Sequence, residues 1–148
     1  MRFSIDSNVL VYAADSGAST KHVIAMALMN RAAELDAVLC TQVLGEFLAV
    51  VRRKLPEQFT AAAEQAERWA TLFPTIDTAS QNLIDGAALA LRYQLQFWDS
   101  VILETARSAG AEVLLSEDMA NGVTIAGVML VNPFAAGNHQ LLDILLER

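Results

Sequence analysis

The chain has 148 residues, of which 54% are hydrophobic and 18% are charged, and its formal net charge is −7. This length suits one domain with a buried core, so we expect residues 1–148 to form a single domain. On charge alone the acidic balance argues against a nucleic-acid partner, unless clustered carboxylates hold divalent cations that reverse the local field.

Three further exclusions follow from the sequence. The longest stretch without Asp, Glu, Lys or Arg, residues 119–142, contains Pro133, three glycines and three asparagines, so we expect no membrane span. Asp6 falls too early for the apolar core of a secretory signal, so none is expected. The single cysteine, Cys40, excludes an intrachain disulfide and suits a reducing cytoplasm.

Short apolar runs alternate with amphipathic stretches along the chain. The predicted elements of the first half are a strand over 2–6, a helix from 7, a helix over 19–36, a strand over 37–41, and helices over 42–54 and 60–73. Thr60 is the expected N-cap of the last of these helices. Alternation of this kind predicts helices packed on a parallel sheet.

The second half continues the alternation. Its predicted elements are a strand over 74–77, a helix from 78 to about 93, a helix over 97–110, strands over 112–116 and 128–132, and a C-terminal helix over 139–148. Thr78 and Gln81 form a predicted capping box, and Gly110 is a predicted helix C-cap. The whole pattern indicates an α/β sandwich with a small parallel sheet of about four or five strands.

Acidic residues follow two of the predicted strands. Asp6 lies at the end of the first strand, and Ser116, Glu117 and Asp118 follow the strand over 112–116. Open parallel sheets bind ligands beyond the carboxyl ends of their strands. Both groups of side chains are therefore expected at one edge of the sheet.

Two more acids lie at the margins of predicted helices. In helical projection Glu46 falls at the border of a wide apolar arc, and Asp99 lies in the first turn of the helix over 97–110. Trp98 projects onto the apolar face of that helix, which favours a packing role. Taken one at a time, each acid also fits a plain role: a cap or turn for Asp6, a surface charge for Glu46, a favourable helix-dipole charge for Asp99 and a loop residue for Asp118.

Together these residues resemble the PIN-domain superfamily, and within it the VapC-type toxins of toxin–antitoxin pairs. The matching stretches are "FSIDSNVLVYAAD", "QVLGEFLAVVRRK", "FWDSVILETARSAGAEVLLSEDM" and "VMLVNPF", and together they extend over nearly the whole chain. The third stretch, in which an aromatic-Asp helix leads into a strand and an acidic loop, is the most specific. The resemblance implies a three-layer α/β/α sandwich and a metal-dependent ribonuclease.

The resemblance also implies roles for individual residues. Asp6, Glu46 and Asp99 match the three acids that hold the metal in the family, and Asp118 matches a fourth, more variable acid. Ser7 and Asn8 match the small polar pair that supports the site, and Ser116 or Glu117 is expected to assist the fourth acid.

Four carboxylates in one pocket repel one another, and a hard cation such as Mg²⁺ or Mn²⁺ relieves that repulsion. One or two such ions are therefore the expected cofactor, and they remove the objection to RNA as substrate. The chain's own cations for RNA phosphates are expected at Arg52, Arg53 and Lys54, although this run also complements the dipole of its helix.

Two other functions compete with the nuclease. An aspartyl-phosphate phosphatase would need a second Asp two residues after Asp6, where the chain has Asn8. A PIN-like module that binds RNA or protein but has lost cleavage remains open. By resemblance the expected partners are a small antitoxin protein and a second copy of the chain in a homodimer.

Overall fold

A computed structural model describes all residues 1–148. The chain forms one six-stranded sheet in the order β3-β2-β1-β4-β6-β5, in which every pair is parallel except β5 with β6. The strands are β1 (Phe3–Ile5), β2 (Ala37–Cys40), β3 (Thr75–Ile76), β4 (Val113–Leu115), β5 (Thr124–Ile125) and β6 (Val128–Val131).

Seven helices flank this sheet. They are α1 (Ser7–Ala14), α2 (Thr20–Ala32), α3 (Thr41–Lys54), α4 (Phe59–Leu72), α5 (Ser80–Tyr93), α6 (Phe97–Ser108) and α7 (His139–Leu145). Short 3-10 turns occupy Ser16–Ala18, Pro56–Gln58 and Ala136–Asn138. The predicted α/β sandwich is thus confirmed, with six strands instead of four or five, because the two-residue strand β5 was not predicted.

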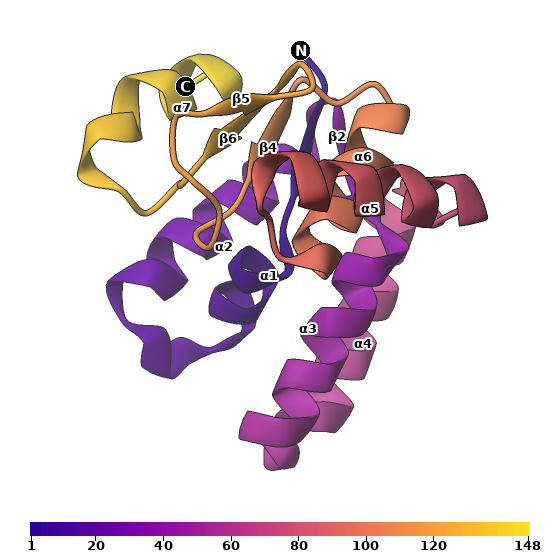
Figure 1. Cartoon of the computed structure of the whole chain (residues 1–148). Coiled ribbons are helices and arrows are strands. Elements are labelled where there is room, and N and C mark those ends of the chain that lie inside the picture. The colour runs from indigo at the N-terminus through magenta and orange to yellow at the C-terminus, as the bar shows by residue number, and fades with distance from the viewer.

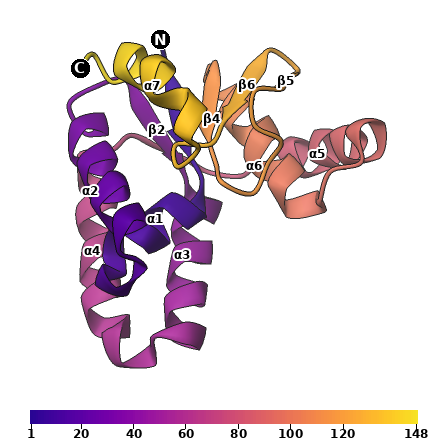
Figure 2. The same cartoon turned by 90° about the vertical axis from the view of Figure 1, so that its left-hand side faces the viewer.

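The helices form two layers with the sheet between them. Figure 2 shows α5 and α6 on one side of the sheet and α1, α2 and α4 on the other. The paired helices α3 and α4 extend away from the sheet to a tip that lies at the opposite end of the molecule from both termini (Figure 1). No helix combines the length and the apolar character that crossing a bilayer requires.

The three central strands are short and completely buried. All residues of β1, β2 and β4 are buried, as expected for parallel strands covered on both faces. Cys40 ends β2 as a core residue, and burial raises the pKa of its thiol to about 12, which keeps the thiol protonated. Cys40 therefore serves as a small, buried residue of the core.

Helix ends agree less well with the sequence patterns. Gly110 has a positive φ of 86°, as its predicted C-cap role requires. Thr60 is not an N-cap, because α4 already begins at Phe59. Thr78 does not cap either: α5 begins at Ser80, and the side chain of Asn82 accepts the hydrogen bond from the Ala79 N–H.

The helices α5 and α6 approach each other closely at a glycine. A Cβ placed on Gly86 would lie 3.0 Å from Val101 Cγ2 and 3.1 Å from Val101 Cα. Since a backbone atom cannot rotate away as a side chain can, this packing requires the absence of a side chain. A Cβ placed on Gly45 in α3 would have no neighbouring atom within 4 Å.

These two glycines give a matched test of the packing. Gly45→Ala should stabilise the protein by about 0.5–1 kcal/mol, the usual gain of alanine over glycine inside a helix. Gly86→Ala should instead destabilise it by about 1 kcal/mol, because the overpacking against Val101 exceeds that gain. Urea unfolding of both variants measures the difference, and stabilisation by Gly86→Ala would contradict the close contact.

Candidate functional site

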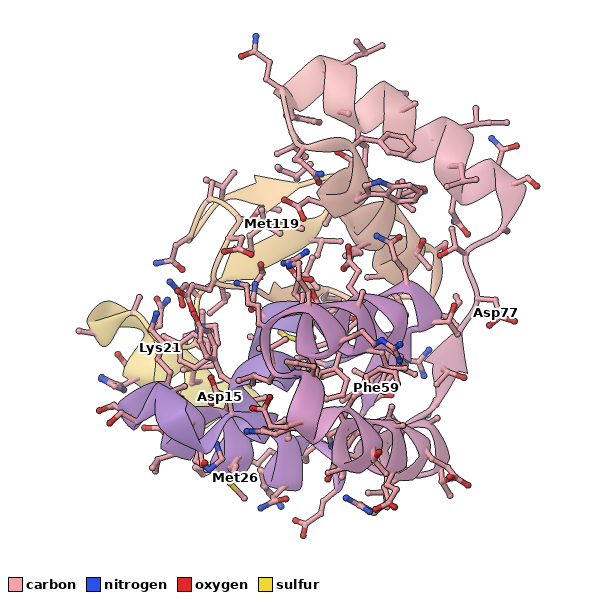
Figure 3. The ribbon with its side chains drawn as sticks, turned by 90° about the horizontal axis from the view of Figure 1, so that it is seen from below. Asp15, Lys21, Met26, Phe59, Asp77 and Met119 are labelled. Atoms are coloured by element: carbon pink, nitrogen blue, oxygen red, sulfur yellow. The ribbon has the colours of Figure 1, made fainter.

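The candidate site lies at the carboxyl ends of the central strands, the edge that faces the viewer in Figure 3. Asp6 follows β1 and is the N-cap of α1, and its side chain is only 3% exposed. The backbone N–H of Ser7 donates to Asp6 Oδ1 at 2.7 Å, and Ser116 Oγ donates to Asp6 Oδ2 at 2.7 Å. Both Asp6 oxygens are therefore held, one by α1 and the other by the end of β4.

Asn8 fixes the loop that follows β4. Its Nδ2 donates to Asp118 Oδ2 at 3.2 Å and to Ser116 Oγ at 3.4 Å. Its Oδ1 accepts from the Glu117 N–H at 3.3 Å. One side chain on the first turn of α1 thus orients three consecutive residues of a segment more than a hundred positions away.

Glu117 and Asp118 face different surroundings. Glu117 Oε1 accepts hydrogen bonds from Lys21 Nζ at 2.7 Å and from the Tyr12 hydroxyl at 3.3 Å. Asp118 instead contacts Asn8, and its charge raises the pKa of both Asp6 and Asp99. Of the two candidates for the fourth acid, Asp118 is the one directed toward the other acids.

Glu46 and Asp99 come to this edge from α3 and α6. Glu46 is partly buried in the second turn of α3, and Gln42 Nε2 donates to its Oε2 at 3.4 Å. Asp99 lies in the first turn of α6, where its N–H donates to the side chain of the N-cap residue Gln96 at 2.9 Å. Asp99 therefore does not cap the helix, and its carboxylate is free to interact with the other acids.

The acids influence one another's protonation. Burial is the largest cause that raises the pKa of Asp99 to about 6, followed by the charges of Asp6, Asp118 and Glu46. Burial also raises the pKa of Asp6 and of Glu46, and each is raised further by another acid's charge, while hydrogen bonds to Ser116, Ser7 and Gln42 lower them. The structure thus collects negative charge at one edge of the sheet.

The donors at this edge fit a hard divalent cation by their chemistry, since they are carboxylate, amide and hydroxyl oxygens and no softer ligand intervenes. Beyond the effect of burial, the acids repel one another and so raise the pKa of Asp99, and a bound cation would relieve this repulsion. As the side chains stand, however, no three His, Cys, Asp or Glu groups are close enough to hold one metal ion together. The acids lie near one another, but they do not form a complete set of ligands around one point.

The three predicted phosphate-binding cations diverge in space. Lys54 lines a groove of about 480 Å³ between α1 and α3, together with Ser7, Asn8 and Asp118 of the site. The guanidinium of Arg52 lies 5.0 Å from the ring centroid of Phe59, on another side of the helix. Arg53 is exposed. Only Lys54 therefore borders the same groove as the site.

Two features of the site were outside the sequence prediction. Gln42 supports Glu46 from one helical turn earlier, a spacing of four residues that the sequence does display. The contacts of Tyr12 and Lys21 with Glu117 carry no sequence signal, because they join α1 and α2 to a loop far along the chain. Trp98, predicted to pack in the core, is 48% exposed beside Asp99, which corrects that prediction.

Comparisons with known proteins bear on this arrangement. A family model of the PIN domain matches residues 4–120. A search of curated protein sequences finds no match. The solved structure of PAE2754 from Pyrobaculum aerophilum superposes with a TM-score of 0.67 at 16% identity, covering 100% of this chain and 97% of its own.

Two further solved structures share the fold. VapC20 from Mycobacterium tuberculosis, a toxin that cleaves the sarcin–ricin loop, has a TM-score of 0.64 at 18% identity and covers 78% of this chain and 91% of its own. VapBC2 from Rickettsia felis, bound to a fragment of promoter DNA, has a TM-score of 0.63 at 18% identity and covers 89% and 98%. At these identities the likeness concerns the fold.

The raised pKa of Asp99 has a testable consequence for stability. Between about pH 4 and pH 6 the folded protein keeps a proton on Asp99 that the unfolded chain, with an ordinary pKa of 3.8, has released. The metal-free protein should therefore lose stability as the pH rises through this window. Asp99→Asn should reduce that loss by about 1 kcal/mol, a value discounted for the partial exposure of the group.

Urea unfolding in EDTA at pH 5 and pH 7 measures this pH dependence. Asp143→Asn, which alters an exposed acid of α7, should leave the difference between the two pH values unchanged. An Asp99→Asn variant with the same pH dependence as the wild type would show that the pKa of the Asp99 carboxyl is not raised in the folded protein.

Proposed function

Because the chain belongs to the PIN-domain family, we propose that it is a metal-dependent endoribonuclease that acts as the toxin of a toxin–antitoxin pair. The observation that supports this function best is the gathering of four acids, Asp6, Glu46, Asp99 and Asp118, at the carboxyl ends of β1 and β4. The VapC20 structure, which shares the fold, is of a toxin that cleaves RNA at the sarcin–ricin loop.

In this proposal Asp6 and Asp99 hold an Mg²⁺ or Mn²⁺ ion, while Glu46 and Asp118 hold a second ion or orient the attacking water. A bound divalent ion supplies positive charge that activates water and stabilises the negative charge developing on the phosphate. Ser7, Asn8 and Ser116 keep Asp6 and Asp118 in place through the hydrogen bonds described above. Glu117 is assigned a structural role, since Lys21 already pairs with it.

The proposal uses Lys54 to bind an RNA phosphate in the groove between α1 and α3. This side chain borders the groove that also reaches Asp118, so it can neutralise a phosphate next to the one that is cleaved. Arg52 and Arg53 are proposed to attract RNA only through the positive electrostatic potential at the end of α3, without direct phosphate contacts. The groove thereby provides the positive charge that the acidic site lacks.

The whole chain, residues 1–148, is proposed to act as one PIN domain in the cytoplasm. Support for a single unit comes from the C-terminal segment, in which Leu142 and Leu145 of α7 and the following Leu146 are buried in the common core. A homodimer is proposed as well, supported by the exposed apolar side chains Leu83, Ile84 and Leu91 of α5.

Cleavage by the purified protein tests the enzyme. With Mn²⁺ present the wild type should cut single-stranded RNA, and EDTA should stop the reaction. Asp6→Asn and Asp99→Asn should each lower the rate by at least about 100-fold, since loss of a ligand costs no less than loss of its supporting contacts. Asp143→Asn, a charge-matched change outside the site, should keep the wild-type rate.

Two outcomes would contradict the assignment in different ways. Cleavage that survives both Asp6→Asn and Asp99→Asn would place the chemistry elsewhere. A protein that binds Mn²⁺ and RNA without ever cutting RNA would instead be the binding module that the sequence left open.

Expression in a bacterial host tests the toxin role. We expect the wild type to arrest growth, and Asp6→Asn, which should not cleave, to have no effect. Co-expression of a neighbouring gene that encodes a small DNA-binding protein should relieve the arrest, as expected of an antitoxin. Normal growth on expression of an active nuclease would favour a housekeeping role for the protein.

A further inference from the structure

A second surface region, here called the flank, adjoins the candidate site on the side away from Lys54. Two adjoining cavities lie there, and both are lined by Gln42 and Trp98. One, of about 370 Å³, is also lined by Thr41, Asp77 and Thr78, and the other, of about 390 Å³, by Gly45, Glu46 and Ala49. The flank therefore begins at Glu46 of the site and ends at Asp77, on the side of the sheet edge opposite Lys21 (Figure 3).

Trp98 gives this flank an aromatic surface. Its side chain is 48% exposed, whereas the only other tryptophan, Trp69, is buried at 6%. Phe97 contacts Trp98 edge to face, with a centroid distance of 4.9 Å, and supports the indole. An exposed, supported indole next to a candidate nuclease site is suited to stack on an unpaired base.

The polar groups around the cavities are rich in acceptors. Gln42 Nε2 donates to Trp98 O at 3.2 Å and to Glu46 Oε2 at 3.4 Å, which leaves Oε1 as the remaining hydrogen-bonding atom of the amide. Gln42 Oε1 then has no partner and is closed off from water, and the same holds for Thr78 Oγ1. Two such oxygens beside one cavity are unusual, because buried polar atoms are normally paired.

We propose that this flank is a subsite for one unpaired nucleobase of the RNA, stacked on Trp98, and that guanine fits it best. Guanine presents two neighbouring donors on its Watson–Crick edge, the ring N–H and the amino group. With small side-chain rotations, Gln42 Oε1 and Thr78 Oγ1 can accept from them, and the carboxylate of Asp77 adds a third acceptor. Uracil offers one ring N–H, and adenine and cytosine offer only their amino groups.

The inference rests on the proposed function, since it names the base that the nuclease would bind next to the cleaved bond. The cavity with the acceptors adjoins the one lined by Glu46, and Gln42 and Trp98 line both, so the phosphate of a base stacked on Trp98 can lie toward the acids. Trp98 acts in this scheme by positioning the RNA and takes no part in the chemistry.

Neutral nucleosides test the subsite apart from metal binding and cleavage. In a ¹⁵N-labelled sample with EDTA, guanosine should shift the indole N–H signal of Trp98 and leave that of Trp69 unchanged. Inosine, which lacks the amino group, should bind about fivefold more weakly, as expected for one lost hydrogen bond. Uridine should bind more weakly still.

Two pairs of variants sharpen the test. Thr78→Val removes one acceptor without changing the size of the side chain and should weaken guanosine binding about fivefold. Thr75→Val, which alters an exposed threonine of the same segment outside the cavity, should not. In the wild type, guanosine should also shift the backbone amide signals of Gln42 and Gly45, which line the same cavity. Trp98→Ala should abolish these shifts, and Trp98→Phe should retain them.

The inference is overturned if guanosine leaves the Trp98 signal unchanged, or if guanosine, inosine and uridine bind equally well. If guanosine leaves the Trp98 signal unchanged but the protein cuts RNA, the proposed nuclease activity stands and the base subsite is refuted. The converse result, nucleoside binding by a protein that cuts no RNA, would support the subsite and refute the proposed enzyme.

Discussion

One buried carboxylate joins the two central strands at their functional edge. Asp6 ends β1, and its two oxygens accept from the Ser7 N–H and from Ser116 Oγ at the end of β4. The strands β1 and β4 are parallel neighbours, so both deliver their next residues to the same place. The position of Asp118, and of the groove that it borders, depends on this connection.

Gathering acids at this edge opposes the stability of the metal-free protein. The hydrogen bonds to Asp6 offset part of the cost of burying its charge, but burial and, to a smaller extent, the charges of the neighbouring carboxylates raise the pKa of Asp99 to about 6. The core compensates with strands that are buried along their full length and with a close helix contact at Gly86. Such a conflict between local electrostatics and stability is typical of functional sites.

The parts of this arrangement that follow from local pattern could be predicted from the sequence. An acid directly after a short apolar run, as at Asp6, and an acid at the margin of a helical arc, as at Glu46, depend only on period and strand direction. The errors arose where tertiary packing decides. Thr78 has the sequence context of an N-cap, yet Ala79 is the N-cap of α5 and the side chain of Asn82 accepts from its N–H. Trp98 falls on the apolar face of α6, but it is exposed together with Phe97 in the first turn of that helix. The two-residue strand β5 was too short to leave a pattern.

The two sides of the acidic site differ in chemistry, and this difference can define a direction for a bound strand. On one side the groove between α1 and α3 offers the ammonium of Lys54, which attracts phosphate without regard to sequence. On the other side Trp98 and the oxygens of Gln42 and Thr78 offer a stacking face and acceptors, which respond to the base. A single strand that satisfies both sides must cross the acids with its phosphate toward α1 and its base toward α6. Selectivity for RNA sequence would then arise from Trp98 and Thr78, which are not among the proposed metal ligands, and from Gln42, which also supports Glu46 and so links base selection to the metal site.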